Sequence, residues 1–121
     1  MIDRYHSLGE MPLSLPVFPL AGVLLLPRGA LPLNIFEPRY LELVDDALSG
    51  DRLIGVIQPA EDEEEALKPK LAAVGCAGRI VSFRETEDNR YLITLSGVCR
   101  FRVRAELDSP NAYRRVKSDF A

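Results

Sequence analysis

Hydrophobic and polar positions alternate most regularly near the end of the chain. Between residues 99 and 106, charged side chains take every second position, and the positions between them hold small or apolar side chains: Cys99, Phe101, Val103 and Ala105. A period of two over eight residues predicts a strand with one face in the core and one in solvent. Similar patterns predict a hairpin of strands at residues 75–84 and 90–96, and a last strand at residues 112–117.

A second period, close to that of a helix, follows Pro38. Apolar residues recur at positions 40, 41, 43, 44, 47 and 48, which is the stripe of an amphipathic helix. Pro38 suits the first helical position because it has no N–H to donate, and Glu37 complements the positive end of the helix dipole. We expect the helix to stop at a left-handed Gly50. Asp45 and Asp46 lie near the negative end of the dipole and oppose it.

Prolines dominate the first third of the chain. Six prolines within 38 residues exclude a long helix but suit short strands that begin or end at a proline. We expect three such strands, joined by turns at 19–22 and 27–30: residues 15–18, 23–26 and 31–35. A buried strand is predicted at residues 52–57, and the acidic segment 60–71 is expected to be an exposed loop.

Together these elements predict a mainly β domain with one or two helices. A chain of 121 residues has the length of one domain. About six short strands with turns rich in proline and glycine favour a small pseudo-barrel, with a helix covering one mouth. We expect a flexible arm at residues 1–14, the barrel at residues 15–117 and a frayed end at residues 118–121.

Charge, cysteines and hydropathy exclude several classes of protein. A net charge of −3 argues against nucleic-acid binding driven by overall charge, although residues 79–121 carry 9 basic and 6 acidic groups. Two cysteines and one histidine, His6, are too few for an ordinary zinc site, so we expect no metal. Cys76 and Cys99 could form a disulfide, but we expect two reduced, buried thiols. The most apolar stretch, residues 17–26, is too short to span a bilayer. We expect a cytoplasmic protein.

The sequence has no pattern typical of a catalytic or cofactor site. It lacks a G-x-S-x-G nucleophile elbow, a G-x-x-x-x-G-K-[ST] phosphate loop and a G-x-G-x-x-G dinucleotide motif. His6 lies in the predicted arm, where it is a poor general base. Most carboxylates lie on the outer face of the predicted helix and in the acidic loop, not opposed across a cleft. We therefore expect neither enzymatic activity nor a cofactor.

Arginines gather on the predicted sheet and form a candidate basic patch: Arg79, Arg84, Arg100, Arg102 and Arg104. Such a face can bind RNA phosphates or an acidic peptide. The alternative is a solvated face whose arginines pair with glutamates on neighbouring strands: Glu85, Glu87 and Glu106. The scarcity of aromatic side chains that could stack on bases favours the solvated face.

Glu37 is a candidate for a structural ion pair. It lies between the apolar residues Ile35 and Phe36 and the predicted helix, so we expect it to be partly buried. A buried carboxylate needs a cation or hydrogen-bond donors. Arg39 is close in sequence and Arg100 could be reached across the sheet, so we expect an ion pair that ties the helix to the barrel.

Three blocks of sequence in a fixed order resemble a known family. They are Leu15-Pro16-Val17-Phe18-Pro19-Leu20, Leu31-Pro32-Leu33-Asn34-Ile35-Phe36-Glu37-Pro38-Arg39-Tyr40 and Gly97-Val98-Cys99-Arg100-Phe101. With residues 52–56 between them, the blocks resemble the N-terminal, substrate-binding domain of the ATP-dependent Lon protease, a domain that also occurs in short stand-alone bacterial proteins. The resemblance covers residues 15–116. It implies structural roles for the motif residues Pro19, Leu20, Pro32, Phe36, Glu37, Arg39, Tyr40, Gly97 and Arg100.

The resemblance implies a six-stranded, PUA-like pseudo-barrel with one helix, which in the family is usually followed by a helical bundle. The chain ends at Ala121, about where the bundle would begin, and it lacks the Lon ATPase motif and Ser–Lys catalytic pair. We therefore expect recognition without proteolysis, through binding of unfolded or degron-bearing polypeptides or docking to a protease or chaperone partner. Assembly into a homo-oligomer is compatible with this expectation.

Two binding modes compete. In the first, apolar residues near the proline-rich turns accept an extended hydrophobic segment, in one form by strand addition at an open edge: Leu24, Leu25 and Leu31. The alternative is that all three lie in the core. In the second mode a PUA-like barrel binds RNA through its arginines, but analogy of fold alone is a weak reason to expect this.

Overall fold

Six strands and one helix make up the part of the chain that the computed structural model describes, residues 12, 14–60 and 70–120. The elements are β1 (Ser14–Pro19), β2 (Ala30–Ile35), α1 (Pro38–Ser49), β3 (Leu53–Ile57), β4 (Val74–Glu85), β5 (Tyr91–Leu107) and β6 (Arg114–Phe120). The predicted mainly β fold with a helix is confirmed. His6, most of the predicted arm and the acidic run at residues 61–65 lie outside the described residues.

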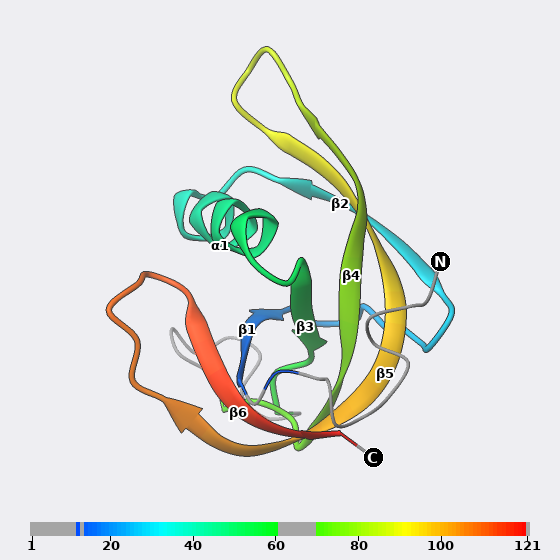
Figure 1. Ribbon diagram of the computed structural model, residues 1–121, viewed down its shortest axis with the longest axis vertical. Helices are drawn as coiled ribbons and strands as arrows, with labels where there is room; N and C mark the ends of the chain where they lie inside the picture. Colours follow the sequence, from blue (N-terminus) through cyan, green and yellow to red (C-terminus); the bar gives the residue numbers. More distant parts are fainter. Residues whose placement is uncertain (1–11, 13, 61–69, 121) are drawn as a thin grey trace.

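The barrel closes around β5. The strand order is β2-β5-β4-β3-β1-β6, and β6 pairs again with β5. Because β5 is 17 residues long, its first half pairs with β2 and its second half with β6, while β4 runs along most of its length (Figure 1). Among the described strands β2 pairs only with β5, and Pro32 on this edge strand has no N–H to offer a further strand.

Hydrophobic side chains are buried in two clusters on opposite faces of the sheet. The larger cluster packs against α1, which contributes Leu43, Val44 and Ala47. The smaller cluster surrounds Phe101. Successive side chains of a strand point to opposite faces, so β3 supplies Ile54 to the larger cluster and Leu53 to the smaller one. The all-apolar sequence of β3 follows from this double burial.

Helix α1 spans the predicted residues and lies between the projecting β4–β5 hairpin and the turn before β6 (Figure 1). The hydroxyl of Tyr91 donates a hydrogen bond to Asp45 at 2.8 Å, and that of Tyr113 donates one to Asp46 at 2.6 Å. The two carboxylates oppose the helix dipole, but they bind neighbouring elements. In the described residues no helix has the length and hydropathy needed to cross a membrane.

Two predictions about chain reversals and ends were wrong. Gly50 has φ −125°, and the left-handed residue is instead Arg52, with φ 62°, whose N–H donates to the Ala47 carbonyl at 2.8 Å. The expected frayed end at residues 118–121 is ordered as far as Phe120, because Ser118 and Phe120 pair with β5 to close the barrel.

Two predictions about strands were also wrong. Residues 23–26 form no strand, because they cross a face of the barrel rather than join an edge. The strands expected at residues 90–96 and 99–106 are one strand, β5. The pairing of β5 with β4 shifts in register between Ala77 and Gly78. This β-bulge interrupts the alternation of side chains along β5 without ending the strand.

The expected tie between Glu37 and the barrel was wrong as well. Glu37 is the residue before the first turn of α1, makes no side-chain capping hydrogen bond and pairs with Arg39 at 3.2 Å, with side chains 43% and 52% exposed. The two residues are neighbours at one end of the helix, so the pair joins no two elements. An ion pair this exposed contributes little to stability.

Candidate functional site

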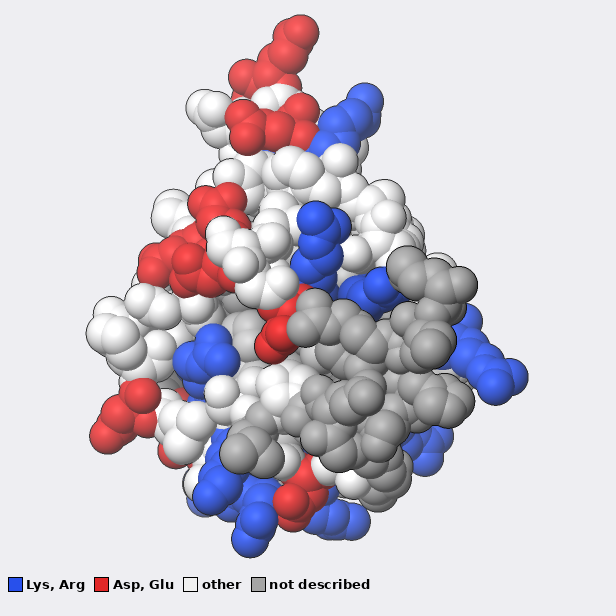
Figure 2. Space-filling view, viewed as in Figure 1, with Lys and Arg blue, Asp and Glu red and all other residues white. Residues whose placement is uncertain are grey.

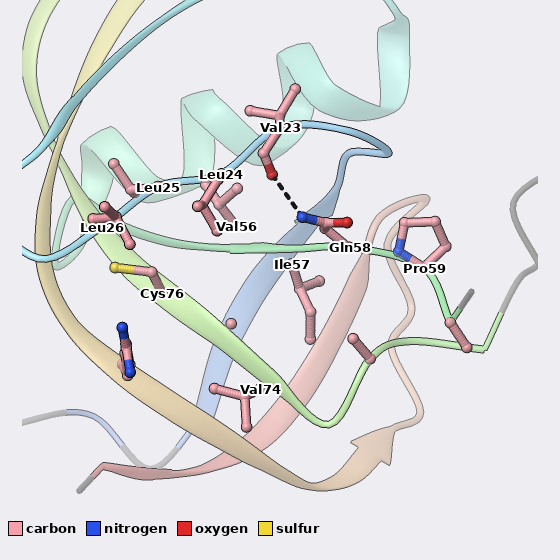
Figure 3. Close-up of a pocket in the computed structure, with 14 residues that line it drawn as sticks. Val23, Leu24, Leu25, Leu26, Val56, Ile57, Gln58, Pro59, Val74 and Cys76 are labelled. Carbon is pink, nitrogen blue, oxygen red and sulfur yellow. Dashed lines mark hydrogen bonds between the residues drawn. The ribbon is translucent and has the colours of Figure 1, made fainter.

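A groove of about 750 Å³ lies between residues 23–26 and the strands β3 and β4. Most of the residues that line it have apolar side chains, and Leu24 and Leu26 on its rim are 69% and 48% exposed. Figure 3 shows residues 23–26 on one side of the groove, with Cys76 and Val74 across from them. Large apolar side chains exposed together beside a hollow are typical of a binding surface.

The wall formed by residues 23–26 is held in place from both ends. Leu25 points inward and is only 4% exposed. Gln58 donates its side-chain N–H to the Val23 carbonyl at 3.3 Å (Figure 3). At the other end, the backbone N–H of Arg28 donates to the Gly97 carbonyl at 2.9 Å, and the backbone N–H of Gly97 donates to the Gly29 carbonyl at 2.8 Å. The wall is therefore a fixed feature of the fold.

Gly97 is needed for this arrangement. A Cβ atom at this position would lie 2.0 Å from the Leu26 carbonyl oxygen, far inside van der Waals contact. Only glycine lets β5 and the segment before β2 approach so closely. The structural role that the resemblance implied for Gly97 is therefore to seat one wall of the groove.

The wall also carries backbone groups that can bind a partner. Within the described residues, Leu24 and Leu25 make no backbone hydrogen bond to another backbone group. Their side chains alternate outward and inward as in a strand. Backbone N–H and C=O groups are obligatory hydrogen-bonding groups, so a short extended chain can pair with this segment.

The chemistry of the groove comes from β4 and β5. Cys76 and Arg100 are partners in the β4–β5 ladder, and both line the groove. Burial is the main cause that raises the pKa of the Cys76 thiol to about 11. The nearby Cys99 also raises this pKa, and the positive charge of Arg100 lowers it. The thiol is therefore neutral near pH 7 and is not an activated nucleophile. Both cysteines are free, as predicted, but Cys99 is only half-buried.

The structure separates the three leucines that were expected to bind polypeptide. Leu24 is exposed at the groove, whereas Leu25 lies in the larger cluster and Leu31 is half-buried on β2 against that cluster. Sequence reasoning missed Leu26 and Val74, which also line the groove. The run of residues 23–26 is apolar throughout, so its sequence did not distinguish the exposed Leu26 from the buried Leu25, and nothing in the sequence pointed to Val74.

The motif residues around the start of α1 have packing roles. Tyr40 stacks on Phe18 with ring centroids 4.1 Å apart, and the Arg39 guanidinium lies 5.2 Å from the Tyr40 ring. Phe36 is 59% exposed and has Arg90 over its ring at 5.6 Å. At the end of β1, Leu20 follows Pro19 and donates its N–H to the Ile57 carbonyl at 2.8 Å.

The arginines of the candidate basic patch lie in separate places. Arg84 pairs with Leu92 near the hairpin tip, and Arg102 lies ten residues farther along β5, which is about 30 Å of strand. Arg100 faces the groove, and Arg104 pairs with Asp119 at 3.3 Å. One of the three glutamates expected to pair with this face, Glu106, pairs with Arg114 at 2.6 Å.

Figure 2 shows the resulting charge distribution. Acidic side chains are prominent at the hairpin tip, beside a basic one, and over α1, and basic side chains are prominent at the opposite end, where β5 and β6 meet. Among the described residues, no three His, Cys, Asp or Glu side chains are placed to share a metal ion.

Comparison with known proteins identifies the family. Residues 14–120 match the ATP-dependent protease La (LON) substrate-binding domain. The chain is 37% identical over 106 residues to Lon protease 2 of Sorangium cellulosum and 32% identical over 111 residues to Lon protease 2 of Myxococcus xanthus. These matches cover 86% and 91% of the chain but 13% of each relative. The chain thus spans about an eighth of the curated relatives it matches.

Solved structures agree. A Lon N-terminal domain protein from Xanthomonas campestris superposes with a TM-score of 0.72 at 33% identity, over 89% of this chain and 59% of that one. The N-terminal domain of the Mycobacterium avium complex Lon protease shares the fold, with a TM-score of 0.70 at 16% identity over 89% of this chain and 54% of that one. The chain therefore belongs to the Lon substrate-binding domain family.

Proposed function

We propose that the chain is a non-catalytic recognition module that binds unfolded or degron-bearing polypeptide in the groove beside residues 23–26. The observation that carries the proposal is the exposure of Leu24 and Leu26 above an apolar groove of about 750 Å³. Unfolded chains differ from folded ones in exposing apolar side chains in extended segments. A groove with an apolar lining and a fixed wall suits such a segment.

Binding would use both side chains and backbone. Apolar side chains of the bound segment would cover Leu24, Leu26 and Val74 and remove them from water. Each buried leucine contributes roughly 1.5–3 kcal/mol when fully covered. The backbone of the segment would pair with the N–H and C=O groups of Leu24 and Leu25, which lack backbone partners within the described residues. Backbone pairing is independent of sequence, which suits the recognition of many substrates.

The Lon protease relatives support a protease context for this recognition. The two Lon protease 2 relatives carry the matching region as 13% of their length. On this proposal, the chain delivers bound polypeptide to a protease or chaperone partner in the cytoplasm. The free Cys76 and Cys99 are compatible with that reducing compartment.

Fluorescence anisotropy with labelled peptides from an unfolded protein tests the proposal. We expect saturable binding that Leu24→Ser weakens, because the substitution removes an exposed apolar contact without disturbing the core. Val81→Ser is the matched control, since Val81 is 50% exposed on β4 and does not line the groove. No saturable binding at high micromolar concentration, or equal loss in the two variants, would contradict the proposal.

A further inference from the structure

We propose that the groove selects apolar polypeptide segments that carry one acidic side chain, and that Arg100 binds the carboxylate. This inference rests on the proposed polypeptide binding and names the class of segment bound. Among the described residues that line the groove, Arg100 is the only one with a charged side chain. All the other lining residues are apolar, glycine or proline, except the thiol of Cys76 and the amide of Gln58.

The position of Arg100 is set by the sheet. Arg100 pairs with Cys76 across the β4–β5 ladder. On its other side β4 pairs with β3, and β5 pairs with β6 from Phe101 onward. Side chains that are opposite each other in a ladder lie on the same face of the sheet. The guanidinium is therefore presented at the groove from a rigid strand. It has no salt-bridge partner within the part of the chain that the structure describes.

The surroundings of Arg100 favour a carboxylate over other groups. A guanidinium offers five N–H donors in a planar fork that fits the two oxygens of a carboxylate. The apolar lining lowers the local dielectric once a ligand covers the groove, which strengthens a charge-assisted hydrogen bond. The other polar side chain with N–H donors in the groove, the neutral amide of Gln58, already donates one N–H to the Val23 carbonyl. A basic side chain in the bound segment would be repelled.

The partner is thus an extended segment with aliphatic side chains on either side of one Asp or Glu. The aliphatic side chains would meet Leu24 and Leu26, and the acidic side chain would cross the groove toward Arg100. Segments of this composition are found inside folded proteins next to a buried or half-buried ion pair, and they become accessible only on unfolding.

Anisotropy titrations with three amidated peptides test the inference. The peptides share a leucine- and valine-rich sequence with polar flanks and differ only at the central residue, which is Glu, Gln or Lys. Amidation removes the terminal carboxylate. With the unaltered protein at low ionic strength we expect the Glu peptide to bind roughly three- to tenfold more tightly than the Gln peptide, and the Lys peptide to bind more weakly than both.

A charge-neutral variant assigns the effect to one residue. In Arg100→Gln, the Glu and Gln peptides should bind equally, at the affinity of the Gln peptide for the unaltered protein. Arg84→Gln is the matched control, because it removes the same charge from an exposed position near the hairpin tip, and it should keep the preference for Glu. The peptide comparison on the unaltered protein does not depend on the folding of either variant.

The outcomes separate the two proposals. Equal binding of the Glu and Gln peptides to the unaltered protein overturns the role of Arg100 and leaves polypeptide binding intact. A preference for Glu that persists in Arg100→Gln also overturns it. Failure of all three peptides to bind, together with failure of the peptides from an unfolded protein, overturns the proposed function itself.

Discussion

Helix α1 and residues 23–26 both place apolar side chains in the larger buried cluster, but they differ in the side chains that they turn toward solvent. The helix buries Leu43, Val44 and Ala47, and its outward carboxylates accept hydrogen bonds from tyrosines of other elements. Residues 23–26 bury Leu25 but leave Leu24 and Leu26 in solvent. The helix therefore turns mainly polar side chains toward solvent, whereas residues 23–26 leave large apolar side chains uncovered by the described part of the chain.

The difference follows from where the backbone hydrogen bonds are made. A helix satisfies most of its own N–H and C=O groups, so it can pack against a sheet face at little cost. An extended segment can do so only by joining a sheet edge, and residues 23–26 instead cross a face. The backbone groups of Leu24 and Leu25 and the outward side chains of Leu24 and Leu26 therefore remain available, which is why we place polypeptide binding there.

The largest expected effect is on the helix side. Leu43→Ala should lower the free energy of unfolding by about 2–5 kcal/mol, because Leu43 is fully buried and the cavity left behind cannot collapse completely. Leu24→Ala should change it by no more than about 0.5 kcal/mol. Urea denaturation followed by circular dichroism measures both. Equal losses would mean that Leu24 belongs to the core, and the contrast between the two regions would fail.

A smaller loss of stability is expected at Gly97, where β5 packs against residues 23–26. Gly97→Ala should cost roughly 1–3 kcal/mol of stability, because the added Cβ would collide with the Leu26 carbonyl and displace the wall of the groove. Peptide affinity should fall in the same variant. Gly50→Ala is the control, since its Cβ would meet only the Asp46 carbonyl oxygen, at 3.6 Å. Unchanged stability and affinity in Gly97→Ala would show that the wall is not seated as described.

The smallest loss of stability is expected when the hydrogen bonds from Tyr113 and Tyr91 to the carboxylates of α1 are removed. Tyr113→Phe should lower the free energy of unfolding by about 1 kcal/mol, because it removes the hydrogen bond to Asp46 from a buried hydroxyl. Tyr91→Phe should cost less, since the bond from Tyr91 to Asp45 is exposed to solvent. Thermal unfolding of both variants at pH 7 checks the order, and a larger loss in Tyr91→Phe would reverse it.

The hydrogen bond between Tyr113 and Asp46 also predicts that the free energy of unfolding depends on pH. Burial, together with the hydrogen bond to Asp46, raises the pKa of Tyr113 above its ordinary value of 10.0. In the unfolded chain the hydroxyl ionises near pH 10 while the folded protein keeps its proton. The stabilisation is therefore complete below pH 10 and is lost as the pH rises through the raised pKa. Tyr113→Phe should lose less stability than the unaltered protein over that range.

Much of the fold was predictable because it depends on local patterns. The helix after Pro38 and the alternating half of β5 were found from period alone, since burial on one face imposes that period on the sequence. The predicted strand at residues 23–26 failed for a related reason. An apolar run with alternating exposure looks the same whether it pairs at an edge or crosses a face.

The sequence by itself determined the fold class, the family and the character of the groove lining, because these depend on residue types and on blocks such as residues 31–40. Only the tertiary structure decided that Leu24, Leu26 and Val74 line the same groove as Arg100 while Leu25 faces the core. The groove joins residues 23–26 to residues 56–60, to residues 72 and 74–76 and to Arg100. Which side chains line it depends on a β-bulge and on the absence of a single Cβ at Gly97, and neither contact is encoded in a local pattern.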